Sequence, residues 1–363
     1  HGERGAGDGG STLTTSEAAS PPPPRGGNAS GRAEPDPRRS PDGHAAAKPA
    51  TSCPLCGGSG RHLRTMPVDA KTFKPTAHGR VHGCEACAFE YIAPRPTPQE
   101  TASFYDFSGY YTQGGFYPAQ SVDRRSFMSR LRDHLAWRVD RSDNMVDVMT
   151  RRLPRGAQVV DIGSGDGSQL ALLSQRGLRM TGVERDTKSA SLQGEHTQVF
   201  EGSAEALPAQ LARGSFDGVM FKQVLEHLVD PVGALRNAAQ LLKPGGVMFV
   251  EVPNNDSAIA HQSGLSWEHM DAPRHLNFFT QDTLRATATA SGLAFESVFF
   301  SEYCRYFSDA YIAIEQRIFD HLGGAGPAQR NSSARAWQLL LKTAGAARRV
   351  KYDCVGVVAV KPR

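Results

Sequence analysis

From residue 157 onward, short apolar runs alternate with stretches whose apolar residues recur at helical spacing. The stretches 168–177 and 230–246 predict amphipathic helices, each ended by glycine. The apolar runs predict strands, namely AQVVDI (157–162), RMTGVE (179–184), TQVFEG (197–202), FDGVMF (216–221) and GVMFVEVP (246–253). Strands that alternate with helices form a doubly wound parallel sheet, and its ligands bind beyond the carboxyl ends of the strands. The pattern therefore predicts an α/β fold with a binding site at that edge.

The first predicted strand runs into a glycine loop, VVDIGSGDGS (159–168), with glycines at alternate positions 163, 165 and 167. Backbone without Cβ atoms can approach a ligand closely. Glu184 ends the second predicted strand, and a carboxylate there can accept hydrogen bonds from both hydroxyls of a ribose. The two features together predict a ribose-bearing cofactor; the alternative is that the glycine motif and Glu184 only shape turns.

The loop departs from the dinucleotide pattern G-x-G-x-x-G, because Ser168 stands where the third glycine is expected. An NAD-dependent enzyme is therefore the weaker alternative. The stretch Asp161-x-Gly163-x-Gly165-x-Gly167 instead resembles motif I of the class I S-adenosylmethionine-dependent methyltransferases. Four further segments resemble later motifs of that family in the right order, namely GVERD, EGSAEALP, FDGVMFKQVLEHLVDP and LLKPGGVMFVEVPN.

The resemblance covers about residues 150–300 and implies a Rossmann-like seven-stranded sheet. FESVFF (295–300) and CVGVVAVKP (354–362) would supply its last two strands, the final one antiparallel to the others. The family also implies roles for individual residues in S-adenosylmethionine binding. Asp161 would reach the methionine amino group, and Glu184 would hold the ribose. The remaining contacts would come from the loop, from beside the adenine and from near the sulfonium. The residues concerned are Gly163, Ser164, Gly165 and Gly167 in the loop, Ala204 and Glu205 beside the adenine, and Gln223 near the sulfonium.

Ahead of this region, four of the six cysteines form two Cys-x-x-Cys pairs, Cys53/Cys56 and Cys84/Cys87. Two such pairs predict a structural zinc ribbon over residues 51–95, since four thiolates fill a tetrahedral site and leave no open position. Disulfides are the weaker alternative. His78 and His82 in the spacer are interpreted as surface residues, and Cys304 and Cys354 as buried thiols.

The chain has 363 residues, of which 39% are hydrophobic, and its net charge is +4. Residues 1–50 hold eight prolines and nine glycines, and Leu13 is their one Leu, Ile, Val, Met or aromatic residue. Such a segment cannot bury enough apolar surface to fold, so we expect a disordered tail. Four parts are then expected: the tail (1–50), the ribbon (51–95), a linker and helical lid (96–150), and the methyltransferase domain (151–363) with a helical insertion near 303–350.

An aromatic stretch, FYDFSGYYTQGGFYP (104–118), follows a proline-rich connector. A packed linker and a lid over the cofactor are both open interpretations. The aromatic residues concerned are Phe104, Tyr105, Phe107, Tyr110, Tyr111, Phe116 and Tyr117.

Methyl transfer to a hydroxyl or an acidic carbon needs a base near the carboxyl ends of the fourth and fifth strands. Glu226 and His227 follow the fourth predicted strand, and Glu268, His269 and His275 follow the fifth. His275 is our first choice as the base and His227 the second, because imidazole titrates near neutrality. Either histidine could instead only fix a loop. Trp267, Phe278 and Phe279 would wall the pocket or fill the core.

The zinc pairs and the tyrosine-rich connector together resemble the amino-terminal part of sugar C-methyltransferases, although the large carboxyl-terminal domain of those enzymes is missing. A small-molecule acceptor is expected, with a nucleotide-linked sugar as one option. The alternative is an adaptor protein, in which the ribbon recruits a partner and the cofactor fold is not catalytic. The absence of a basic run argues against nucleic acid, no apolar run is long enough for a membrane span, and no stretch resembles an export signal, so the cytoplasm is the expected compartment.

Overall fold

A computed structural model describes residues 51–105, 126–185 and 197–363 of the chain. The expected disordered tail lies outside these residues. So do five residues of the aromatic stretch, Phe107, Tyr110, Tyr111, Phe116 and Tyr117. Residues 48–363 cluster as one compact unit, and the boundaries expected within it stay a prediction.

The main sheet has seven strands in the order β10-β11-β8-β7-β4-β5-β6. Neighbouring strands from β6 to β8 run parallel, whereas β11 is antiparallel to both β8 and β10. The predicted α/β class and the reversed last strand are therefore confirmed. The strands are β4 (Gln158–Ile162), β5 (Arg179–Glu184), β6 (Thr197–Glu201), β7 (Phe216–Lys222), β8 (Leu242–Pro253), β10 (Ala294–Ser301) and β11 (Cys354–Val360).

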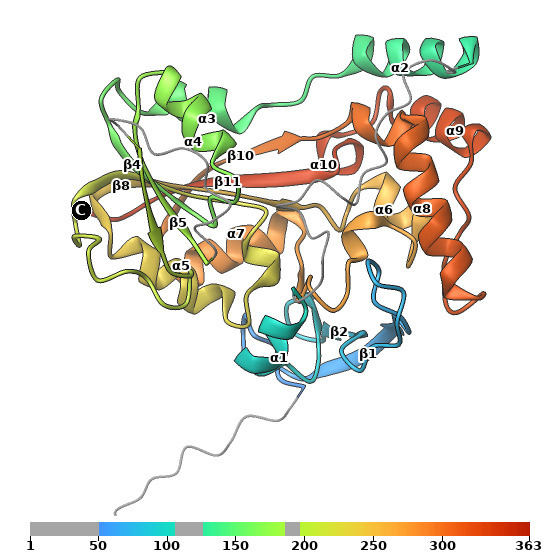
Figure 1. The fold of residues 1–363 in the computed structure, drawn as a ribbon, viewed down its shortest axis with the longest axis horizontal. Coiled ribbons are helices and arrows are strands. Elements are labelled where there is room, and N and C mark those ends of the chain that lie inside the picture. The colour runs from blue at the N-terminus through green and yellow to red at the C-terminus, as the bar shows by residue number, and fades with distance from the viewer. Residues whose placement is uncertain (1–50, 106–125, 186–196) are drawn as a thin grey trace, which may run out of the picture. The chain divides into compact units, whose positions relative to one another are not determined.

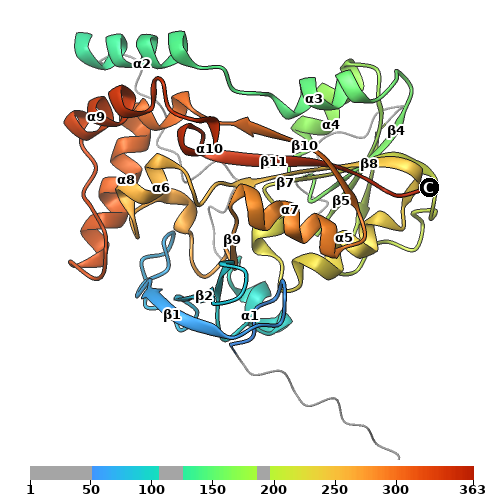
Figure 2. The same cartoon turned by 180° about the vertical axis from the view of Figure 1, so that it is seen from behind.

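Helices cover both faces of this sheet (Figures 1 and 2). Helices α3 (Met145–Arg152) and α4 (Ser168–Gln175) pack on one face through Met149, Leu170 and Leu173. Helices α5 (Pro231–Ala239) and α7 (Gln281–Ala290) pack on the other through residues such as Leu235 and Leu284. The buried strands are apolar on both sides, as a doubly covered parallel sheet requires.

A second, four-stranded sheet has the order β1-β2-β3-β9. Strands β1 (Gly60–Thr65), β2 (Arg80–Cys84) and β3 (Glu90–Ile92) come from the ribbon, and α1 (Pro98–Ser103) follows them. Strand β9 (Asn277–Phe278) comes from the segment after β8 and pairs antiparallel with β3. Distant parts of the chain therefore share one small sheet.

In the sequence, the carboxyl-terminal helices stand between β10 and β11, over the residues where helices were expected. The longer ones are α8 (Asp309–Leu322) and α9 (Ser333–Thr343), which pack on each other, and α9 also contacts α6 (Ala258–Ser263) and α2 (Phe127–Val139). The short elements are η4 (Leu225–His227), η5 (Glu268–Met270), η6 (Cys304–Phe307) and α10 (Arg348–Lys351). Among the described helices, none combines the length and the apolar character that crossing a bilayer would take.

Three details differ from the sequence-based expectations. The helix predicted over 230–246 ends at Ala239, because Leu242 already pairs with Phe216 and begins β8. His82 was expected at the surface, but it is buried in the middle of β2, where its ring neighbours His62 and Tyr91. Cys354 is buried as expected, while Cys304 is half-buried and its thiol contacts Asp140.

Candidate functional site

The glycine loop turns at the carboxyl end of β4, between that strand and α4. Gly163, Gly165 and Gly167 all have positive φ, at 81°, 55° and 79°, a backbone region that glycine enters without steric cost. A Cβ on Gly163 would lie 2.4 Å from Cγ2 of Val224, so the close approach of two loops excludes any side chain there. A Cβ on Gly165 would have no neighbour within 4 Å, which leaves open space on the side where a ligand is expected.

Glu184, at the end of β5, holds this loop from the neighbouring strand. Its Oε2 accepts a hydrogen bond from the backbone N–H of Gly165 at 2.7 Å, and its Oε1 accepts one from the N–H of Arg185 at 2.8 Å. Each carboxylate oxygen has two lone pairs, so both can still accept from hydroxyls. Glu184 therefore shapes the loop, a role that the sequence did not indicate.

Two buried polar atoms beside the loop lack partners. Asp161 Oδ1 and Ser164 Oγ are both buried, and neither has a hydrogen-bond partner in the described part of the chain. Burial raises the pKa of Asp161 to about 7, and the nearby charge of Glu184 adds to the rise while Lys222 opposes it. Unpartnered buried polar groups are costly, so their concentration at a turn fits a ligand that supplies donors.

The remaining expected cofactor residues lie at the same edge of the sheet. Ala204 and Glu205 follow β6, and Glu205 accepts a hydrogen bond from the N–H of Val229 at 3.2 Å. Gln223 follows β7 in a left-handed conformation (φ 56°), and its side-chain amide contacts the sulfur of Cys354 at 3.3 Å. The amide of Gln223 is thus held back against β11.

The structure brings Glu226, His227 and His275 together. Glu226 and His227 lie on η4, directly after β7, while His275 lies just ahead of β9. The two imidazole rings are 4.6 Å apart between centroids, and one ligand-type atom from each of the three residues lies within 4.8 Å of the others. This donor set could also hold a metal ion.

Hydrogen bonds fix one nitrogen of each imidazole. His275 Nδ1 lies 2.7 Å from the carbonyl oxygen of His269, and His227 Nδ1 lies 3.2 Å from that of Arg274. A carbonyl only accepts, so both Nδ1 atoms carry the proton and both Nε2 atoms keep a free lone pair. Burial lowers the pKa of both histidines, which keeps them neutral at pH 7 and able to accept a proton.

Glu226 is the most isolated charge-bearing group of this cluster. It is 1% exposed, and neither of its carboxyl oxygens has a hydrogen-bond partner among the described residues. Burial raises its pKa to about 8, with the charges of Glu251 and Asp271 adding to the rise. Glu226 is therefore largely protonated at neutral pH and able to exchange a proton with a neighbour.

The other candidates after β8 have structural partners instead. Glu268 and His269 both contact the guanidinium of Arg305, and His269 also lies 3.5 Å from a carboxylate oxygen of Asp353. Trp267 is buried and donates its indole N–H to Asp353. Phe278 and Phe279 are buried in the hydrophobic core.

Tyr105 is a site residue that the sequence indicated only through the aromatic stretch. Its hydroxyl lies 3.1 Å from His227 Nδ1, and the guanidinium of Arg185 lies 6.0 Å from its ring centroid. Tyr105 thus contacts both the histidine cluster and the residue after Glu184.

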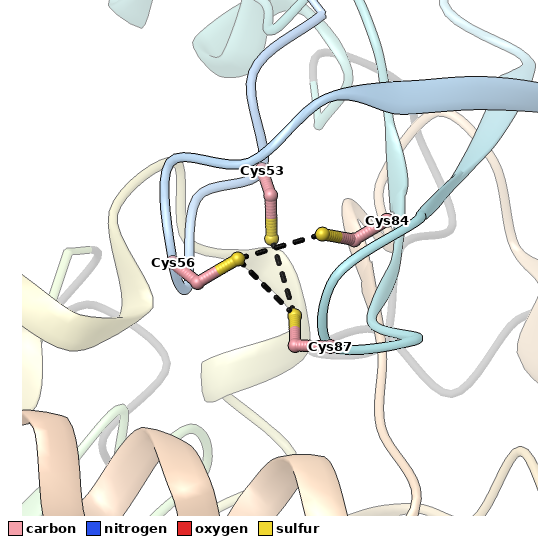
Figure 3. A group of neighbouring side chains, drawn as sticks. All are labelled: Cys53, Cys56, Cys84 and Cys87. Carbon is pink, nitrogen blue, oxygen red and sulfur yellow. Dashed lines mark hydrogen bonds between the residues drawn. The ribbon is translucent and has the colours of Figure 1, made fainter.

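Figure 3 shows the four cysteines converging from two knuckles. The Sγ–Sγ distances are 3.4 Å for Cys56 to Cys84, 3.4 Å for Cys56 to Cys87 and 3.7 Å for Cys53 to Cys87. Thiolates at about 2.3 Å from a tetrahedral ion lie about 3.8 Å apart, close to these separations. Burial raises the pKa of the Cys53 thiol to about 11, so a thiolate there needs a compensating cation. The donor set fits zinc.

Comparisons with known proteins are consistent with this geometry. A family model described as "Methyltransferase domain" matches residues 133–298. The ubiquinone biosynthesis O-methyltransferase of Xanthomonas axonopodis pv. citri is 35% identical over 118 residues, which cover 31% of this chain and 49% of that protein. The enzyme of the same name from Caulobacter vibrioides is 31% identical over 157 residues, 40% of this chain and 62% of that protein. The chain thus spans between about half and 62% of these two relatives.

Among solved structures, Burkholderia thailandensis 1,6-didemethyltoxoflavin-N1-methyltransferase is 18% identical, with a TM-score of 0.43, over 78% of this chain and 99% of that one. The family match covers the glycine loop, Glu184 and η4. The strand order and the reversed last strand agree with it. Residues 133–298 therefore match a methyltransferase domain, and the chain has the α/β methyltransferase fold.

Proposed function

We propose that this protein transfers the methyl group of S-adenosylmethionine to a small-molecule biosynthetic intermediate. One observation supports this most strongly: unpartnered polar atoms and open backbone at the glycine loop occur at the same sheet edge as a pair of neutral histidines. A cofactor fold without catalysis would have no use for the second feature.

In this proposal the cofactor lies across the ends of β4 and β5. Asp161 accepts from the methionine amino group, and Gly163, Ser164, Gly165 and Gly167 form the floor under the methionine and the ribose. Glu184 accepts from the ribose hydroxyls. Ala204 and Glu205 border the adenine, and Gln223 lies toward the sulfonium.

Bound S-adenosylmethionine supplies an electrophilic methyl group and departs as a neutral thioether. The chain must align the acceptor with it, and alignment alone can supply much of the rate. His275 accepts the acceptor's proton on Nε2, and its Nδ1–H bond to the His269 carbonyl holds the ring in the required tautomer. His227 is the second candidate for this role, and Glu226 exchanges the proton with the pair.

The acceptor is either a hydroxyl or an acidic carbon. The names of the relatives favour a hydroxyl, as in O-methylation, whereas the ribbon and the connector favour a nucleotide-linked sugar. Both acceptors need the same base, so the site geometry is compatible with either.

Calorimetry with S-adenosylmethionine and S-adenosylhomocysteine, followed by a screen for transfer of labelled methyl, tests the proposal. The screen should include nucleotide-linked sugars and hydroxylated aromatic intermediates. We expect both cofactor forms to bind and one acceptor class to become labelled. Failure of zinc-loaded protein to bind either form would instead favour an adaptor with a non-catalytic fold.

We also propose that the four cysteines bind one structural zinc ion. Elemental analysis should find about one zinc per chain, and Cys56→Ser should reduce this content severely and lower the melting temperature, because metal binding is part of folding such a ribbon. Cys304→Ser, outside the cluster, is the matched control and should keep its zinc. A full zinc content in Cys56→Ser would contradict the assignment.

Cofactor binding should release protons near neutral pH. Asp161 has a pKa of about 7 in the free protein, so about half of the molecules carry a proton on it at pH 7. An ammonium group beside it would lower that pKa, so binding should release up to about half a proton at pH 7 and almost none at pH 9. Calorimetry in buffers of different ionisation enthalpy measures this release. Identical buffer dependence in Asp161→Asn would exclude Asp161 as its source.

A further inference from the structure

The ribbon and the proposed catalytic turn are joined by a short set of hydrogen bonds. Ile92, in β3 of the ribbon, donates its N–H to the carbonyl of Leu276 at 2.9 Å. The N–H of Leu276 in turn bonds to the carbonyl of Glu226 at 2.7 Å. A single peptide segment beside His275 is thus fixed by the ribbon on one side and by the proposed catalytic turn on the other.

Asn277, the first residue of β9, holds that turn with its side chain. It is 2% exposed, and its Nδ2 lies 3.1 Å from the carbonyl oxygen of Leu225 and 2.8 Å from that of Leu228. These two carbonyls flank Glu226 and His227. One amide group therefore bridges both ends of the turn that presents the two side chains.

Arg95 holds the oxygen end of this amide. Its Nη2 donates to Asn277 Oδ1, and its Nη1 donates to the carbonyl of Leu276 at 2.7 Å. Without a donor at Oδ1, the buried amide would keep its bonds to the carbonyls of the turn but would have an unpartnered oxygen, so it would hold the turn less firmly.

Arg95 is the last residue of the ribbon, and its side chain lies against another ribbon residue, Tyr91. Its guanidinium lies 6.0 Å from the ring centroid of Tyr91. Tyr91 in turn donates its hydroxyl to the carbonyl of Thr51, two residues before Cys53. Tyr91 and Thr51 therefore link Arg95 and Asn277 to the segment that carries Cys53.

We propose that Arg95 and Asn277 are positioning residues that make the placement of Glu226 and His227 depend on the metal-loaded fold of the ribbon. The four-cysteine centre would then support methyl transfer without touching cofactor or acceptor. This inference rests on the proposed function for its kinetic consequence, but the coupling itself can be measured without any acceptor.

Amide hydrogen exchange at residues 225–228 is the first measurement, on the full chain in zinc-loaded and zinc-depleted form. Zinc removal and Arg95→Gln should each accelerate exchange there at least about tenfold, and zinc removal from Arg95→Gln should add less than about twofold. Arg61→Gln is the matched control, because Arg61 is an exposed ribbon arginine on β1. Unchanged exchange at 225–228 in Arg95→Gln would overturn the proposal.

The second measurement separates positioning from general destabilisation. Arg95→Gln should lower kcat about 10–100-fold, as a displacement of about 1 Å can, while affinity for S-adenosylhomocysteine stays within about twofold. Arg95→Lys, which keeps one donor, should recover part of this loss. If Arg95→Gln does not fold, the wild-type protein alone decides. Slow amide exchange at residues 225–228 that persists after zinc is removed would then overturn the proposal. If amide exchange at residues 225–228 depends on zinc and Arg95 but no methyl transfer is found, the result would count against the proposed function alone.

Discussion

Replacement of His275 by alanine should lower kcat about 10²–10⁴-fold, the range that a general base contributes. His275 is 3% exposed and its Nδ1 is held by the His269 carbonyl, so the free Nε2 is the atom placed to receive a proton. Steady-state kinetics with the identified acceptor would give the loss. Affinity for S-adenosylmethionine should stay within about threefold, because in the proposed arrangement the imidazole would lie beside the acceptor and not under the cofactor.

The pH profile provides an independent check on this assignment. Burial lowers the pKa of His275 below the ordinary histidine value of 6.5. In the free enzyme, this base should therefore stay neutral even at pH values somewhat below 6.5. The acidic limb of kcat/KM should accordingly lie below pH 6.5 and disappear in His275→Ala. His134→Ala, on the exposed face of α2, serves as control. Wild-type turnover in His275→Ala would exclude it and direct attention to His227.

Replacement of Glu184 by alanine should weaken S-adenosylmethionine binding about 10²–10⁴-fold. Hydrogen bonds to a charged group contribute about 1.5–3 kcal/mol each, and the variant loses those to ribose. It also loses the anchor of the Gly165 N–H, so the loop itself becomes less ordered. Calorimetry should show the weaker binding while circular dichroism shows the fold retained.

Glu184→Gln divides these two contributions. A glutamine oxygen can still accept from the Gly165 N–H, so the loop should keep its shape while the charge is lost. We expect an affinity between those of the wild type and Glu184→Ala. Glu201→Ala, at the exposed end of β6, is the matched control and should bind normally. Unchanged affinity in Glu184→Ala would remove the ribose assignment.

Much of the fold could be predicted because each element carries its own local signal. The apolar run of β4 followed by alternating glycines defines a strand and a turn without reference to distant residues. The two Cys-x-x-Cys pairs likewise imply knuckles from spacing alone, and the four sulfurs do converge in the structure. Glu226, His227 and His275 were predicted because all three follow strands that end at the same sheet edge.

What could not be predicted depends on contacts between distant segments. Nothing near Asn277 in the sequence indicates that its amide bridges a turn some fifty residues earlier, or that Arg95 orients it. His82 appeared to be a solvent-exposed spacer residue, because two-residue periodicity is weak in a five-residue strand like β2. Tyr105 was one of seven aromatics in its stretch, and only the fold shows that it reaches His227.

The pairing of β9 with β3 has a consequence for how such proteins can diversify. A ribbon cut out as residues 51–95 would leave the N–H and C=O groups of β3 unpaired along one edge, which invites non-specific association. The ribbon is therefore poorly suited to be moved alone from one methyltransferase to another. A ribbon placed in another protein would also need the segment with β9, which completes its sheet. Chimaeras that respect this dependence should move both segments together.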